Sequence, residues 1–294
     1  SAWVQIGYSR YQFSGKLDAN LQATSTVTRW NGSPLTVQIT VGQDATAGVI
    51  SGSVSDGVWM APLSGGRSLA SSPYAGEYTV VIPGTPGNAS LPAGDGYATM
   101  HVAADGLGTM SGSLADGTAF AQSAYVTVDG DWPLYVSLYV GKGAIVSWLT
   151  FTNLTSSDVS GDLVWIKQAG ASTTSFPLGF TIGTKAVGSV YVAPDAYSKA
   201  VNLSGAVVSF SGGSLGSSFN NVVSVNAGSQ VVNLSPNLLT LTVSTGAGSF
   251  SGQVSEPGNG LVHKFGGVIL QKQNAGYGTM VGTPNGSRVV LAAP

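Results

Sequence analysis

A five-residue pattern that occurs six times constrains the fold of this chain more than any other feature. Each copy reads apolar residue, Ser, Gly, any residue, apolar residue. The copies are Phe13–Leu17, Ile50–Val54, Met110–Leu114, Val159–Leu163, Leu203–Val207 and Phe250–Val254. Such repetition indicates one supersecondary unit used several times. Glycine weakens a strand unless a bend, a bulge or a close backbone approach requires it, so we interpret these glycines as strand bends. A glycine at the exit of a turn is the alternative.

Tight-turn signals separate the segments that have strand character. Leu35–Val41 alternates apolar and polar residues, and similar stretches follow along the chain. Between them lie Asn-Gly and Asp-Gly pairs, which favour hairpin turns that match the twist of antiparallel strands. The pairs are Asn31-Gly32, Asp56-Gly57, Asp95-Gly96, Asp105-Gly106, Asp116-Gly117, Asp129-Gly130, Asn259-Gly260 and Asn285-Gly286. We therefore predict an all-β protein of antiparallel meanders.

The length of 294 residues allows one large β domain or two of about 150 residues. Three copies of the repeated pattern fall in each half, and the polar stretch Asn153–Asp158 separates them. We predict two pseudo-repeated β-barrel or β-sandwich lobes, at residues 1–152 and 153–294. One continuous, larger sheet system is the alternative.

Charged residues are unusually rare in this chain. They make up 8% of it, against roughly 25% in ordinary soluble domains, and the net charge is −2. A nucleic-acid partner would need a basic stripe, so none is expected. No run of about 18 apolar residues occurs, so we expect no membrane insertion. Weak charge repulsion favours self-association, and the expected partner is another copy of the chain.

Catalytic and metal-binding patterns are not found in the sequence. There is no cysteine, and the two histidines lack the spacing of a zinc site. We predict no enzyme activity, no cofactor and no metal site. A hydrolase on a β scaffold is the least favoured alternative. It would require Asp131, Asp158 or Asp162 to meet a histidine in one cleft.

Tryptophans beside turns are the better candidates for a functional role. Trp30 and Trp132 both flank turns, where an exposed ring could stack on a glycan or anchor a protein partner. A carbohydrate-binding module is therefore the alternative function. In contrast, Trp59, Trp148 and Trp165 lie in alternating segments and are predicted to belong to the core.

Several longer stretches resemble the C-terminal β-rich region of very large secreted or surface proteins from bacteria of the planctomycete–verrucomicrobial type. These stretches are Trp132–Gly143, Trp148–Phe151, Gly266–Gly278 and Ser33–Gln38. The resemblance covers nearly the whole chain and carries no known catalytic residue. It implies a bacterial, extracellular or cell-surface setting and a chain that forms the tail of a longer polypeptide.

The first residues suggest how copies of the chain could associate. An alternating stretch begins at once, with Trp3, Val4, Ile6 and Tyr8. An open strand edge there would invite pairing with another chain. We therefore predict a non-catalytic structural or adhesive surface protein, self-assembling into a fibre through β-strand exchange at this segment.

Overall fold

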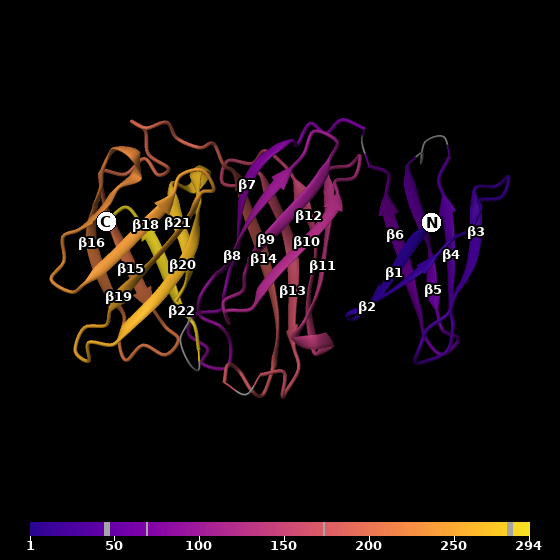
Figure 1. Ribbon diagram of the computed structural model, residues 1–294, viewed down its shortest axis with the longest axis horizontal. Helices are drawn as coiled ribbons and strands as arrows, with labels where there is room; N and C mark the ends of the chain where they lie inside the picture. The colour runs from indigo at the N-terminus through magenta and orange to yellow at the C-terminus, as the bar shows by residue number, and fades with distance from the viewer. Residues whose placement is uncertain (44–47, 69, 173, 281–284) are drawn as a thin grey trace.

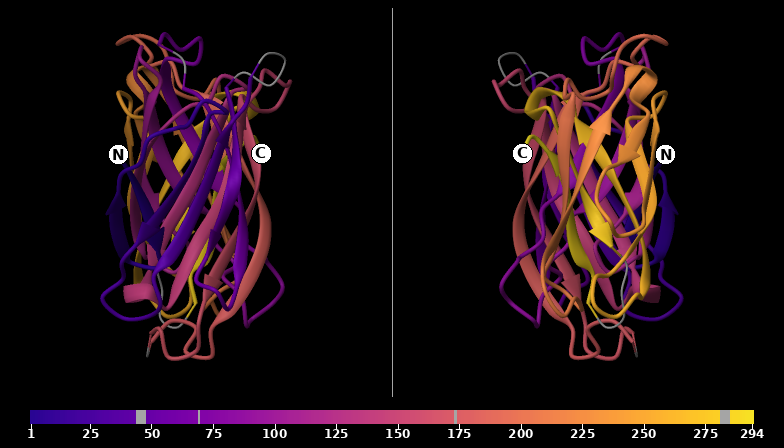
Figure 2. Two further views of the ribbon diagram at one scale, coloured as in Figure 1. Left: turned by 90° about the vertical axis from the view of Figure 1, so that its right-hand side faces the viewer. Right: turned by 90° about the vertical axis from the view of Figure 1, so that its left-hand side faces the viewer.

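The computed structural model describes residues 1–43, 48–68, 70–172, 174–280 and 285–294. Its strands are all antiparallel, which confirms the all-β prediction. Three units lie side by side along the longest axis, with the N-terminus in the unit at the right of Figure 1 and the C-terminus in the unit at the left. The units overlap when viewed along this axis (Figure 2).

The middle unit, here the central barrel, is an eight-stranded sheet whose first and last strands, β7 and β14, pair with each other. Its edge strands β10 and β11 lie side by side, so the sheet is nearly closed. The strands are β7 Gly76–Ile82, β8 Gly96–Val102, β9 Leu107–Ser113, β10 Ala119–Tyr125, β11 Asp131–Leu138, β12 Gly143–Phe151, β13 Val159–Lys167 and β14 Phe180–Val190.

The C-terminal barrel repeats this plan, since its first strand β15 pairs with its last strand β22. The two edge strands of this sheet, which do not pair with each other, are β17 and β18, and we call the space between such edge strands the gap of the barrel. Together the two barrels confirm the prediction of two pseudo-repeated β lobes. The strands are β15 Gly205–Ser211, β16 Phe219–Val225, β17 Val231–Asn233, β18 Leu239–Ser244, β19 Ser249–Ser255, β20 Val262–Leu270, β21 Ala275–Met280 and β22 Ser287–Ala292.

An additional N-terminal unit precedes the barrels. A hairpin of β1 and β2 packs against a four-stranded sheet of order β3-β4-β5-β6. Among the described strands, β1 pairs with β2 alone and β6 with β5 alone, so the strands of this unit do not close into a barrel. The strands are β1 Ala2–Ile6, β2 Ser9–Phe13, β3 Gln22–Val27, β4 Leu35–Val41, β5 Val49–Ser55 and β6 Met60–Gly66.

The sheets do not divide at the predicted boundary between residues 152 and 153. β12 and β13, on either side of it, pair with each other from Phe151↔Val159 to Gly143↔Lys167. The polar stretch after residue 152 is a hairpin turn, closed by the bond from Thr152 N–H to Asp158 O. Polar composition marks turns within a domain as well as boundaries between domains, so the lobes 1–152 and 153–294 are corrected to the three units above.

The repeated Ser-Gly pattern has a steric cause in four of its six copies. In these copies the glycine lies inside a strand, at Gly52, Gly112, Gly161 and Gly252. A Cβ atom at any of them would lie between 1.9 and 2.1 Å from a carbonyl oxygen of the neighbouring strand. Close backbone approach therefore requires glycine there, which is a different cause from the strand bend that the sequence suggested. No backbone atom crowds Gly15 or Gly205 in the remaining two copies.

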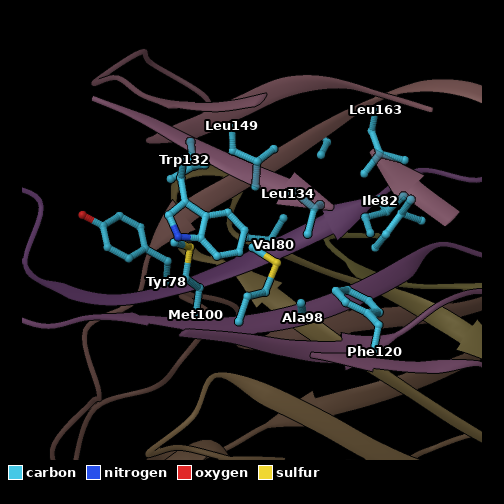
Figure 3. Packing of buried hydrophobic residues seen from close by; sticks show 14 of the residues in the cluster. Tyr78, Val80, Ile82, Ala98, Met100, Phe120, Trp132, Leu134, Leu149 and Leu163 are labelled. Atoms are coloured by element: carbon cyan, nitrogen blue, oxygen red, sulfur yellow. The ribbon is translucent and has the colours of Figure 1, made fainter. Parts of the chain in front are cut away.

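Trp132 lies at the centre of the central barrel. Its ring is fully buried beside Met100 and Leu149 (Figure 3). The indole Nε1–H donates to Ala124 O at 2.8 Å, so its polar atom is satisfied. A Cβ on Gly108 would come within 2.6 Å of this nitrogen, so that glycine makes room for the ring.

Polar side chains bridge the gap in each barrel. In the central barrel, Gln122 on β10 accepts a bond from Tyr135 N–H at 2.6 Å and donates to Pro133 O at 2.5 Å, both on β11. In the C-terminal barrel, Asn237 beside β18 donates to Asn221 Oδ1 on β16 at 2.9 Å. Side-chain amides thus replace part of the missing backbone ladder.

The junction between the two barrels is buried and its polar groups are paired. Thr79 Oγ1 donates to Ile269 O at 2.6 Å, and Arg288 Nε donates to Asp95 Oδ2 at 2.8 Å. Burial raises the pKa of the Asp95 carboxyl, although the Arg288 guanidinium opposes that shift. The paired groups fix the two barrels against each other.

Candidate functional site

Exposed apolar side chains gather on two neighbouring turns of the N-terminal unit. Trp30, between β3 and β4, is 96% exposed; Val58 and Met60, at the turn between β5 and β6, are 90% and 73% exposed. Trp59 in the same turn is 39% exposed. Both turns lie at one end of the unit, because an antiparallel meander returns to the same end at every second turn. We call Trp30, Val58, Trp59 and Met60 the aromatic tip.

A salt bridge ties the two turns of the aromatic tip together. Arg29 Nη2 lies 3.0 Å from Asp56 Oδ2, and Arg29 Nε donates to Ser33 O at 2.6 Å. Asp56 Oδ1 also accepts the backbone N–H groups of Val58 and Trp59. Partial burial alone would raise the pKa of Asp56, but these hydrogen bonds and the Arg29 guanidinium together lower it. The aromatic tip is therefore held in shape by polar groups that are already paired.

Strand β1 has an open edge with none of the usual protection against pairing. Its sequence, Ala2–Ile6, contains no charged residue and no proline, whereas edge strands are commonly guarded by one or the other. The other edge of the unit, β6, carries Pro62. Val4 and Ile6 pack on the core of the unit, while Trp3 and Tyr8 are 63% and 71% exposed. This edge of β1 therefore carries none of the features that commonly prevent strand pairing.

A polar cleft of about 530 Å³ lies between β2 and the outer face of the central barrel. Arg10 contributes from β2, and the barrel contributes a cross-strand row of Glu77, His101, Thr109 and Ser123. His101 Nδ1 lies 2.6 Å from Glu77 Oε1, but both side chains are more than half exposed. An exposed pair of this kind is screened by water and contributes little on its own.

A recess of about 150 Å³ opens on the C-terminal barrel, across β18, β19 and β20. Leu238 and Val262 form its rim and are 77% and 61% exposed. Leu239 and Val254 also line it, together with the polar residues Thr240, Gln253 and Ser255, and none of its lining residues is charged. We call it the Leu238–Val262 recess.

Of the two tryptophans predicted to contact a ligand, one is exposed and one is not. Trp30 is exposed at the aromatic tip, whereas Trp132 is buried, so its proposed role as a stacking platform is wrong. Among the tryptophans predicted to be core, Trp165 is buried, but Trp59 and Trp148 are 39% and 44% exposed. Sequence reasoning missed Val58, Met60 and the recess. Their exposure depends on which strands are neighbours, and alternation alone does not show that.

The aspartates of the hydrolase alternative do not meet a histidine. Asp131 accepts a bond from Thr150 Oγ1 at 2.6 Å, and Asp158 pairs with Lys272 at 2.7 Å. The histidines pair with the two glutamates instead, and His263 lies 3.1 Å from Glu256. In the described part of the chain, no group of three His, Asp or Glu side chains is placed to hold a metal ion.

Comparisons with protein-family models, curated proteins and solved structures found no match to this chain. In the residues that the structure describes, no helix has the length and apolar character needed to span a membrane.

Proposed function

We propose that this protein is a non-catalytic, extracellular structural or adhesive surface protein whose copies assemble through strand β1. The observation that carries the proposal is the open edge of β1, which has neither charge nor proline. The net charge of −2 adds little repulsion between copies. The resemblance to large bacterial surface proteins supports the setting.

Period-two alternation defines how two copies of β1 would pair. Val4 and Ile6 face the core of the unit, and Trp3 faces away. In an antiparallel pair centred on Val4, each Val4 lies opposite the other, and Ala2 lies opposite Ile6. This register keeps both apolar faces on the same side and joins the two hairpins into one four-stranded sheet. The contact is two-fold, so each copy presents the same surface.

Cysteine cross-linking tests this pairing directly, because the natural chain contains no cysteine. The variant Val4→Cys is expected to form disulfide-linked dimers under mild oxidation, since directly opposite Cβ atoms lie about 5 Å apart. Tyr11→Cys is the matched control. Tyr11 pairs with Val4 in register and packs on the same core, but lies one strand farther from the open edge.

Cross-linking of Val4→Cys well ahead of Tyr11→Cys would support the proposal. Equal rates for the two variants, or monomeric Val4→Cys at every concentration, would overturn it. Light scattering on the natural chain gives the second readout, and a mass that rises above 29.6 kDa with concentration is expected.

Glycan binding is the second candidate function, favoured by the 96% exposure of Trp30. The burial of Trp132 leaves Trp30 as the single predicted platform. Arg29 and Asp56 beside it are already paired with each other and with backbone groups. A sugar-dependent change in tryptophan fluorescence that is lost in Trp30→Ala would shift the conclusion to this function.

A further inference from the structure

We propose that Lys167 and Asp116 form an isopeptide bond, a covalent amide between their two side chains that closes the central barrel. Lys167 Nζ lies 2.7 Å from Asp116 Oδ2, and both side chains are 1% exposed. Lys167 is the last residue of β13, and Asp116 lies in the turn between β9 and β10. The bond forms within one chain, so it does not depend on the pairing of copies through β1.

Aromatic rings surround the pair and separate it from solvent. Lys167 Nζ lies 4.7 Å from the centre of the Tyr139 ring and 5.9 Å from the centre of the Phe176 ring. Trp165 and Phe176 are buried, and Phe180 packs edge-on against both. Two charges in such surroundings are costly to desolvate, whereas an amide carries no charge. Water is a product of amide formation, so its exclusion also opposes the reverse reaction.

The hydrogen bonding of Lys167 suits an amide better than an ammonium group. An ammonium has three protons to donate. In the part of the chain that the structure describes, Asp116 Oδ2 is the one hydrogen-bond acceptor for Lys167 Nζ. Lys272 differs, because its Nζ has three oxygen partners, namely Asp158 Oδ1, Asn153 Oδ1 and Leu154 O. An amide nitrogen keeps a single proton, so the bond removes the donors of Lys167 that face only aromatic rings.

Different donors hold the two carboxyl oxygens of Asp116, and this distinguishes the oxygen that stays from the one that leaves. Oδ1 accepts the backbone N–H of Thr118 at 3.0 Å, and Oδ2 accepts the hydroxyl of Tyr139 at 2.7 Å. Trp165 Nε1–H donates to this hydroxyl at 3.1 Å and so orients it. Burial and the Asp116 carboxylate raise the pKa of Tyr139, so its hydroxyl keeps the proton that it donates.

The reaction is a condensation that needs no oxidant and no co-reactant. One proton passes from the Lys167 ammonium to Asp116 Oδ2 along their hydrogen bond, which leaves an amine and a carboxylic acid. The lone pair of Nζ then attacks Cγ, and the Thr118 N–H stabilises the negative charge that develops on Oδ1. A second proton passes from Nζ to Oδ2, the Cγ–Oδ2 bond breaks, and one water molecule leaves. Because the groups are already in contact, no entropy is lost in bringing them together.

The bond spans the gap of the central barrel. It joins residues that are 51 positions apart, and the edge strands β10 and β11 lie within the loop that it closes. These edge strands do not pair with each other. A covalent tie between the β9–β10 turn and the end of β13 therefore keeps the two edges together where the backbone ladder does not.

Mass spectrometry of the intact, denatured chain tests the bond. We expect the mass to be lower than that of the 29.6 kDa sequence by one water molecule. Trypsin should leave Lys167 uncut and release residues 68–142 and 143–185 as one branched peptide, joined between Asp116 and Lys167. The peptide is needed because a succinimide at Asp116-Gly117 would lose the same mass, but it would leave Lys167 open to cleavage.

Substitutions assign the mass loss to this pair. Lys167→Arg keeps the charge but removes the amine nucleophile, so this chain should have the full mass of its sequence. Lys272→Arg is the matched control. Lys272 Nζ also lies 2.7 Å from a carboxylate oxygen, that of Asp158, and this variant should still lose one water molecule. In Tyr139→Phe, the bonded fraction should rise at least about tenfold more slowly after cell-free synthesis, because Oδ2 lacks its hydroxyl donor.

Three results would overturn the inference. The first is a natural chain that unfolds cooperatively but has its full mass. The second is a loss of one water molecule that persists in Lys167→Arg, which would indicate a succinimide. The third is a loss that disappears equally in Lys272→Arg. A full-mass chain that still cross-links through Val4→Cys would reject the isopeptide bond and leave the proposed function standing.

Discussion

Replacing one glycine of the repeated pattern with alanine should destabilise the central barrel. A Cβ on Gly112 would lie 2.1 Å from Tyr97 O and 2.7 Å from both Cα and Cβ of Ala98, whereas ordinary contacts begin at 3.4 Å. β8 and β9 would have to separate by more than 1 Å at this point. Overpacking of this kind costs about 1–3 kcal/mol, and each weakened ladder bond adds about 1 kcal/mol.

The expected loss of unfolding free energy for Gly112→Ala is therefore about 2–4 kcal/mol, or roughly 10 °C in the melting temperature of a unit of this size. Gly205→Ala is the matched control from the same pattern. No atom lies within 4 Å of a Cβ built there, so its effect should stay within about 0.5 kcal/mol. Calorimetry on both variants provides the measurement. Equal melting temperatures would refute the steric account of the pattern.

Three further perturbations test the structure elsewhere. Trp132→Phe should lower the urea-unfolding free energy by about 2 kcal/mol, because it leaves Ala124 O without its donor and creates a small cavity. Asp116→Ala should cost about 3–5 kcal/mol in the same assay, because it leaves the buried Lys167 ammonium, 2.7 Å away, without its counter-charge. Since the folded-state pKa of Asp56 is lowered, its stabilisation is present above the ordinary value of 3.8 and is lost as the pH falls through the folded-state pKa. Protection factors of the amides in the β5–β6 turn, which are exchange rates corrected for their intrinsic pH dependence, should therefore fall in acid, and Asp56→Asn should abolish that fall.

Local signals in the sequence were sufficient to predict the class of fold. Period-two alternation and the Asn-Gly and Asp-Gly pairs mark strands and turns through backbone preferences that need no tertiary contact. The order of strands in the sheets was harder to predict from the sequence. The polar stretch Asn153–Asp158 reads as a boundary, but it is a hairpin turn within one sheet. Asp95 reads as a turn residue, yet it is buried against Arg288 of the other barrel.

The candidate site was predicted only in part. Trp30 and Trp132 both flank turns in the sequence, but Gly108 on β9 makes room for Trp132 inside the barrel. Nothing comparable covers Trp30, which ends 96% exposed. The Leu238–Val262 recess involves three strands, so no local pattern could have revealed it. The unprotected edge of β1 could be predicted, because charge and proline content are properties of the sequence itself.

The pairing of first and last strands in each barrel sets an order for folding. Every other ladder within the barrels joins consecutive strands and can form from short hairpins, whereas closure brings distant residues together. At this closure Thr184 Oγ1 bonds to Pro83 O, 101 residues away in the chain. Loop-closure entropy makes such a step late and slow. β7 lacks its pairing partner β14 until that strand has been synthesised. The N-terminal unit has no such step, because its first and last strands do not pair. We therefore expect it to reach its final form on the ribosome while the barrels are still incomplete.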